Sequence, residues 1–90
     1  MKLIKTSKYQ SQLLLTLKYI ALDNPLAALS FERELNAKLS LISEQPLMCR
    51  PSHYIQQDEY RDLIHQGYTI IYKVEQDALV VLDIFKWQQR

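Results

Sequence analysis

The sequence predicts an α+β fold in which an antiparallel sheet packs on a helical hairpin, in the order β-α-α-β-β-β. Three observations lead to this fold class. The first half of the chain carries apolar residues at helical spacing, whereas the second half changes to the period of a strand. The 90 residues include one glycine and three prolines, so turns are few. The length fits one small core, and we expect residues 1–90 to form a single domain.

The chain begins with a predicted edge strand. In the segment Met1 to Thr6, two apolar residues lie among lysines, which discourage unwanted pairing at a sheet edge. A first helix is predicted from Ser7, which can serve as its N-cap. The apolar residues that follow recur at helical spacing and predict its buried side: Tyr9, Leu13, Leu17, Ile20 and Ala21.

A second helix is predicted from Pro25 to about Glu44. Asp23 and Asn24 are good capping residues, and the fixed φ of proline suits the first position of a helix. One stripe is apolar and predicts the buried side: Ala28, Phe31, Leu35, Leu39 and Ile42. Because the link between the helices is about three residues long, we expect an antiparallel hairpin with both stripes facing one partner.

The second half of the chain predicts three consecutive strands. Pro46 and Pro51 mark a loop behind the second helix. The strands are expected at Tyr60 to His65, Tyr68 to Val74 and Leu79 to Phe85, which are rich in Ile, Val, Tyr and Phe. The connections between them, residues 66–67 and 75–77, are so short that neighbouring strands must run antiparallel.

The two faces of this sheet have different predicted roles. The helices can bury their stripes on only one face, so we expect the other face to be open. Alternation divides the second long strand into two sets of side chains. We expect the helices to cover Tyr68, Ile70, Tyr72 and Val74. The open face should then carry Thr69, Ile71 and Lys73. Arg61, Leu63 and His65 share one face, whose side depends on the strand register.

Charge and cysteine usage exclude several classes of protein. Lys and Arg total 11 against 10 Asp and Glu, and a net charge of +1 is low for a non-specific nucleic-acid binder. Cys49 is the single cysteine, the N-terminus lacks a secretory signal, and no apolar run approaches the roughly 20 residues of a membrane span. We expect a cytoplasmic protein. A basic strip of Lys2, Lys5, Lys8 and Lys18 suits either an acidic partner or a soluble edge strand.

Metal, cofactor and nucleophile chemistry find little support. Cys49, His53 and His65 match no zinc-site spacing, and we expect a structural thiol and two surface histidines. One glycine leaves no phosphate-binding loop, and Cys49 has no visible activating helix terminus. No metal and no cofactor are therefore expected. The acidic group of Asp58, Glu59 and Asp62 predicts a solvated rim.

Two groups of cations are candidates for binding. An arginine on an open sheet face can bind phosphate or carboxylate through its two nitrogens, and Arg61 is a candidate for this role. Its spacing favours a surface ion pair with Asp58 or Asp83 over such binding. Lys86, Trp87 and Arg90 place an aromatic ring between two cations at the end of the chain. This arrangement can stack on a base or anchor a protein, and packing of Trp87 over the helix ends is an equal alternative.

Five segments, in this order and spacing, carry a family resemblance. They are Pro25-Leu-Ala-Ala-Leu-Ser-Phe31, Pro46 with Arg50, Tyr60-Arg61-Asp-Leu63, Tyr68-Thr-Ile-Ile-Tyr72-Lys-Val74 and Ala78-Leu-Val-Val-Leu-Asp-Ile-Phe85. Together they resemble the RelE/ParE superfamily, the toxins of bacterial type II toxin-antitoxin modules, over nearly the whole chain. The resemblance implies growth inhibition, plasmid stabilisation and a cognate antitoxin that wraps the toxin with a segment that folds on binding. The exposed hairpin surface and the sheet edges are the docking sites that it implies.

The resemblance also bears on the branch of the superfamily. RelE-like members are ribosome-dependent mRNA endonucleases that use basic residues and a C-terminal aromatic acid or base. Arg61 matches one basic position, and with His65 and Lys86 it is the set that a ribonuclease could use. Leu63, Thr69 and Gln89 stand where other cations are expected.

ParE-like members, which inhibit DNA gyrase, have an aliphatic run that ends in Ile-Phe and a histidine, where this chain has Lys86. We expect a ParE-like toxin that acts on gyrase by protein contact. Because most of the ribonuclease residues are missing, we favour a protein without enzyme activity. An mRNA endonuclease working on the ribosome, and a non-toxic relative that binds only its antitoxin, stay open. The candidate target-binding residues are Arg50, Arg61, Lys73, Lys86, Trp87 and Arg90.

Overall fold

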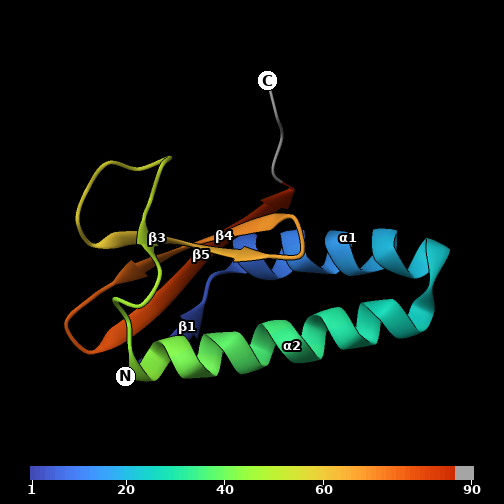
Figure 1. Cartoon of the computed structure of the whole chain (residues 1–90), viewed down its shortest axis with the longest axis horizontal. Helices are drawn as coiled ribbons and strands as arrows, with labels where there is room; N and C mark the ends of the chain where they lie inside the picture. The colour runs from blue at the N-terminus through green and yellow to red at the C-terminus, as the bar shows by residue number, and fades with distance from the viewer. Residues whose placement is uncertain (87–90) are drawn as a thin grey trace.

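The computed structural model describes residues 1–86, and Figure 1 shows two long helices beside a twisted sheet. The helices are α1 (Ser7–Asp23) and α2 (Pro25–Glu44). The strands are β1 (Lys2–Lys5), β2 (Arg50–Pro51), β3 (Tyr60–His65), β4 (Tyr68–Val74) and β5 (Ala78–Lys86). The predicted order of elements is confirmed, and the two-residue β2 is an addition within the predicted loop.

The two helices are joined by one residue rather than by the three that the sequence predicts. The Asn24 side chain accepts hydrogen bonds from the amides of Leu26 and Ala27, at 3.0 and 3.3 Å, and so caps α2. Asp23 still belongs to α1, which shortens the link. The N-cap of α1 was predicted one residue late, because the hydroxyl of Thr6 accepts from the amide of Tyr9 at 3.1 Å.

The sheet has the strand order β1-β5-β4-β3-β2 and is mixed rather than wholly antiparallel. β1 lies at the edge, as predicted, but runs parallel to β5, with Leu3 opposite Leu79. All other neighbouring pairs are antiparallel. Parallel strands need a long connection, and the chain between β1 and β5 supplies one that includes the helical hairpin.

A β-bulge in β5 changes which of its side chains face the helices. Ile71 of β4 lies opposite Asp83, whereas the next residue, Tyr72, lies opposite Val81, so Leu82 is the extra residue. The buried residues of β5 are accordingly Leu79, Val81 and Ile84, with a step of three at the bulge instead of two. Beyond the bulge, even-numbered residues of β5 point to the helix side.

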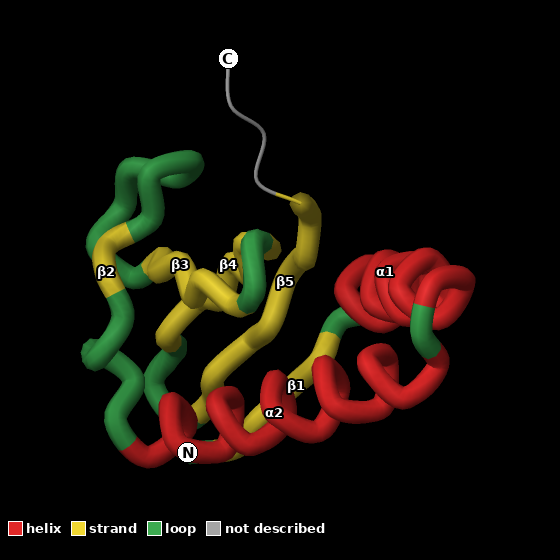
Figure 2. Tube along the Cα trace, turned by 45° about the vertical axis from the view of Figure 1, so that its right-hand side comes forward, coloured by secondary structure: helices red, strands yellow, loops and turns green. Residues whose placement is uncertain are grey.

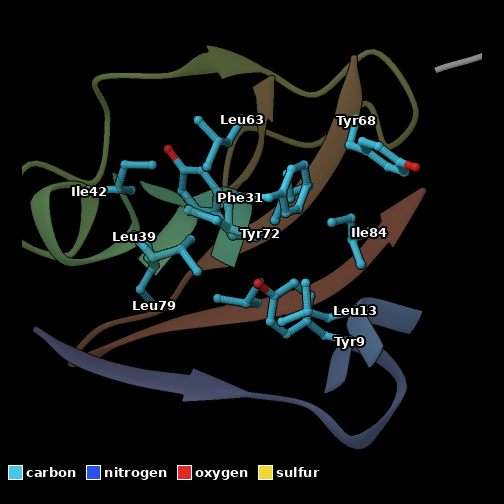
Figure 3. Close-up of a cluster of buried hydrophobic side chains, with 13 residues drawn as sticks. Tyr9, Leu13, Phe31, Leu39, Ile42, Leu63, Tyr68, Tyr72, Leu79 and Ile84 are labelled. Atoms are coloured by element: carbon cyan, nitrogen blue, oxygen red, sulfur yellow. The ribbon is translucent and has the colours of Figure 1, made fainter. Parts of the chain in front are cut away.

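The core lies between the hairpin and one face of the sheet (Figures 2 and 3). All five residues of the predicted α2 stripe are buried. On α1, Tyr9 and Leu13 are buried, while the remaining predicted positions are half-buried. The predicted helix-facing set of β4 joins the same cluster, with Tyr68, Ile70 and Tyr72 buried. The helical and strand periodicities therefore identify the core correctly.

The second face of the sheet is covered along β4, so the expectation of an open face is wrong there. Thr69 and Ile71 are buried. The Tyr54 ring packs edge-on against Phe85, the neighbour of Thr69, with 5.1 Å between ring centroids. The loop between β2 and β3 therefore shields this face, and sequence alternation does not predict where a loop folds back.

Asp62 holds this loop, and its prediction as part of a solvated rim is wrong. The side chain of Asp62 is buried, with 2% of the residue exposed, and accepts a hydrogen bond from the amide of His53 at 2.9 Å. Arg50, its partner in the register of β2 with β3, donates to the same carboxylate oxygen of Asp62 at 3.4 Å. The carboxylate thus ties the start of the loop to the sheet.

Candidate protein-docking site

Arg61 lies on the helix-facing side of the sheet, a choice that the sequence left open because it depends on the strand register. It is opposite Tyr72 in the register, and its Nη1 donates to the carbonyl of Cys49 at 3.0 Å. Neither ion pair considered for it forms within residues 1–86: Asp83 pairs with Lys8 at 3.2 Å, and Asp58 takes part in no ion pair there. Arg61 therefore anchors the loop behind α2.

His65 is buried rather than exposed, and this corrects the expectation of a surface histidine. One per cent of the residue is exposed, and its Nε2 donates to the carbonyl of Phe31 at 3.2 Å. The Phe31 ring stands edge-on to the imidazole, 4.6 Å between centroids. Burial, with a contribution from Lys38, lowers the pKa of His65, while the Phe31 carbonyl and Glu34 oppose this shift.

The remaining sequence candidates are dispersed. Lys73 pairs with Glu75 at 3.4 Å and lies over the Tyr60 ring, and the hydrogen bond to Glu75 is the main cause that raises its pKa. Trp87 and Arg90, the other members of the C-terminal cation-aromatic group, lie outside the described residues. Arg50 is held by Asp62 at the far side of β3.

The three residues that a ribonuclease could use are not gathered at one accessible place. In the register, His65, Tyr68 and Lys86 form a row across β3, β4 and β5. Arg61 lies four residues from His65 on the same strand, which corresponds to roughly 13 Å. Because His65 is also buried beneath Phe31, a substrate could not reach it without opening the core.

An open groove of about 590 Å³ lies where the turn between the helices approaches the end of the sheet. We call it the hairpin-tip groove. Its wall on the hairpin includes Tyr19 and Leu22 of α1 and Ala27 of α2, and its wall on the sheet side includes Tyr68 and Lys86. Gln66, in the turn between β3 and β4, also lines the groove. The φ angles of Gln66 and Gly67, 49° and 85°, are those of a two-residue hairpin turn.

Among the sequence candidates within residues 1–86, Lys86 alone lies in this groove. Its ammonium group is 5.8 Å from the ring centroid of Tyr19 and 5.9 Å from that of Tyr68. The bulge at Leu82 puts Lys86 on the helix side, since it lies beyond the bulge opposite Tyr68. The two rings restrict the position of this ammonium group. The sequence alone does not predict that Lys86 contacts either ring.

Exposed apolar residues lie along the hairpin, and two of them, Tyr19 and Leu22, line the groove. Tyr19, Leu22 and Leu26 are 63, 87 and 72% exposed, and Leu15 and Leu29 are also exposed. These residues lie on the hairpin, away from its buried stripes. The sequence contains their signal, because Leu15, Tyr19 and Leu22 recur at i, i+4 and i+7 outside the predicted core stripe. An exposed apolar surface with a positioned cation at its rim fits protein docking better than catalysis.

Comparisons with known proteins agree with this fold. The family model described as ParE toxin of type II toxin-antitoxin system, parDE, matches residues 3–89. A solved structure described as a chromosomal ParDE toxin-antitoxin system from P. aeruginosa superposes with a TM-score of 0.78 and 19% sequence identity. The alignment covers 98% of this chain and 97% of that one. No curated protein matches.

The fold and the family match define a small toxin-like α+β domain. The chain belongs to the ParE toxin family of type II toxin-antitoxin systems, within the RelE/ParE superfamily that its sequence resembles. Within residues 1–86, neither helix is long and apolar enough to cross a membrane. The same residues contain no group of three or more His, Cys, Asp or Glu side chains that could hold a metal ion.

Proposed function

We propose that this chain is the toxin of a type II module, that a cognate antitoxin neutralises it, and that it inhibits DNA gyrase by protein–protein contact in the cytoplasm. Residues 1–90 act as one toxin domain in this proposal. The observation that carries it is that Arg61 and His65 make hydrogen bonds inside the fold, while an open groove that includes Lys86 and exposed apolar side chains lies at the tip of the hairpin. Membership of the ParE family supports the gyrase target.

The charge of the chain supports contact with a protein rather than with RNA. A ribosome-binding enzyme gains from a strongly basic surface, and this chain has a net charge of +1. Two of the cations that the sequence offers for binding are neutralised by Glu75 and Asp62. At the hairpin-tip groove, Tyr19 and Leu22 expose apolar surface beside Lys86.

The test is induction of the chain in a bacterial host, followed by parallel measurement of DNA, RNA and protein synthesis. We expect DNA synthesis to stop first and co-expression of the antitoxin to restore growth. Purified protein should also impair supercoiling by gyrase. Unchanged supercoiling at saturating protein contradicts the gyrase target.

The same induction separates the alternatives. A primary stop in translation with codon-dependent cuts in ribosome-bound mRNA supports the endonuclease instead, in which case Arg61→Ala should abolish cleavage without unfolding the chain. Normal growth with or without the antitoxin, combined with tight antitoxin binding, identifies a non-toxic family member.

A further inference from the structure

We propose that Thr6 is a positioning residue for Lys86, one of the candidate target-binding residues. The Thr6 hydroxyl links the start of α1 to the bulge of β5, and this link sets the distance between Tyr19 of α1 and the lysine. The inference rests on the proposed function, because Lys86 is a residue through which we expect the toxin to contact its target. Thr6 acts through Lys86 and does not itself touch the target.

The Thr6 hydroxyl makes two hydrogen bonds in opposite directions. It accepts from the amide of Tyr9 at 3.1 Å and donates to the carbonyl of Leu82 at 3.1 Å. The main-chain amide of Thr6 also donates to the carbonyl of Val81 at 3.1 Å. One half-buried residue therefore joins the first turn of α1 to two successive residues of β5.

The bulge explains why the Leu82 carbonyl needs a donor of this kind. A bulge leaves its extra residue outside the regular ladder, and a main-chain carbonyl that is shielded from water needs a partner. The pairing of β1 with β5 ends where Lys5 lies opposite Val81, immediately before the bulge. The Thr6 hydroxyl supplies the donor at the point where β1 ends.

A second side-chain contact joins α1 to the same part of β5. The Lys8 ammonium pairs with the carboxylate of Asp83 at 3.2 Å. The Lys8 side chain is 69% exposed, and an ion pair in such a position adds little to the attachment of α1. The half-buried Thr6 hydroxyl is therefore the stronger of the two links.

The two rings beside Lys86 are held in different ways. Tyr68 is its neighbour in the register of β4 with β5, so the sheet itself keeps that ring near the lysine. Tyr19 lies on α1, 13 residues beyond Thr6, which is roughly 20 Å along the helix axis. Its position over Lys86 therefore depends on the direction in which α1 leaves the sheet.

The distance from Lys86 to Tyr19 leaves little tolerance for such a change. The ammonium group lies 5.8 Å from the ring centroid of Tyr19, and a cation is attracted appreciably only within about 6 Å of an aromatic ring. No ion pair within residues 1–86 includes Lys86, although Asp23 lines the same groove. The Tyr19 and Tyr68 rings therefore orient a charge that is available to a partner.

Substitutions of Thr6 separate the bond to Leu82 from the cap of α1. Thr6→Ser keeps both hydrogen bonds. Thr6→Asp keeps an N-cap as good as threonine, but an ionised carboxylate cannot donate to the Leu82 carbonyl. Ser7→Asp is the matched control, because it adds the same charge at the next, exposed position and leaves the Thr6 hydroxyl in place.

The first measurement is inhibition of supercoiling by purified gyrase. We expect Thr6→Asp to raise the toxin concentration for half inhibition by about three- to tenfold, and Thr6→Ser and Ser7→Asp to leave it within about twofold. In a Lys86→Ala background, Thr6→Asp should have less than about a twofold further effect, because Thr6 acts through the lysine. A purely structural role gives the same loss in both backgrounds.

The second measurement does not need gyrase. The chemical shifts of the Lys86 ε-methylene protons report the rings beside them. These shifts should move toward the values of an unstructured lysine in Thr6→Asp and stay unchanged in Thr6→Ser and Ser7→Asp. Circular dichroism shows whether each variant is folded, and Thr6→Val, which removes the donor without adding a charge, replaces Thr6→Asp if that variant unfolds.

The outcomes distinguish this inference from the proposed function. Wild-type shifts and wild-type potency in folded Thr6→Asp overturn the positioning role and leave the proposed function standing. Equal losses with and without Lys86 also overturn it, since Thr6 then acts on stability alone. A wild-type chain that does not inhibit gyrase contradicts the proposed target, and the Lys86 shifts then still decide whether Thr6 positions the lysine.

Discussion

Arg61 and Cys49 are joined by a hydrogen bond of 3.0 Å from the guanidinium Nη1 to the main-chain carbonyl, which ties β3 to the loop behind α2. Opposite Arg61 on β4, the Tyr72 hydroxyl donates to the carbonyl of Pro46 at 2.9 Å. Burial, and then the neighbouring Cys49, raise the pKa of Tyr72, so its hydroxyl stays protonated and can keep donating. Two neighbouring strands therefore hold the same loop.

Arg61→Ala should destabilise the protein. The change removes a hydrogen bond from a charged donor and leaves the Cys49 carbonyl without it, which costs about 1–2 kcal/mol of the free energy of unfolding. Urea unfolding followed by circular dichroism measures this. The control, Arg33→Ala on the exposed side of α2, should change stability by less than about 0.5 kcal/mol. Full stability of Arg61→Ala with loss of toxicity would contradict the anchoring role.

Asp62→Ala should release the start of the loop between β2 and β3. The variant removes the acceptor of the His53 amide and the partner of Arg50, at a cost of about 1–3 kcal/mol. Hydrogen exchange at the His53 amide should become faster, while Asp62→Asn, which keeps an acceptor, should retain part of the protection. Asp58→Ala, in an exposed position, is the control. Unchanged exchange at His53 in Asp62→Ala would refute the assignment.

Leu35→Ala should be among the most damaging single changes to α2. Leu35 is fully buried in the centre of the predicted stripe, and truncation of a core leucine costs about 2–5 kcal/mol. Leu41→Ala makes the same chemical change on the same helix at a position that is 48% exposed. Thermal unfolding of both variants tests the burial pattern, and similar melting temperatures would show that the pattern is wrong.

Stability should depend on pH through His65. Its folded-state pKa lies below the ordinary value of 6.5, so the unfolded chain takes up a proton at a higher pH than the folded chain does. The contribution of neutral His65 is complete above about pH 6.5 and is lost as the pH falls toward the folded-state pKa. We expect the free energy of unfolding to fall between about pH 7 and pH 5.

His65→Gln is the matched variant, because its amide can still donate to the Phe31 carbonyl but does not titrate. The loss of stability over this pH range should be smaller in His65→Gln than in the wild type. Parallel curves for the two proteins would mean that other groups, such as carboxylates, account for the pH dependence.

Much of this fold is predicted by local pattern. The five apolar residues of α2, the Asn24 cap and the two-residue turn at Gly67 depend on interactions within one element or between neighbours in the chain. Helical and strand periods identify such features because the side chains that share a face are fixed by backbone geometry. The family resemblance adds the class of protein, which the match over residues 3–89 confirms.

The candidate site was less predictable for three physical reasons. The side of the sheet on which Arg61 lies depends on strand register, which a local pattern does not specify. Burial of Asp62 depends on a loop that returns over the sheet. The role of Lys86 depends on the extra residue Leu82, which reverses the alternation of β5 and turns this lysine toward Tyr19.

By itself the sequence determined the helical hairpin, the three antiparallel strands and the family, because periodicity, capping and turn chemistry act over a few residues. Tertiary structure alone decided that β1 runs parallel to β5, that Arg61 and His65 make internal hydrogen bonds, and that Lys86 lies in an open groove at the tip of the hairpin. These features arise from contacts between residues far apart in the chain, whose partners are set only when the sheet is assembled.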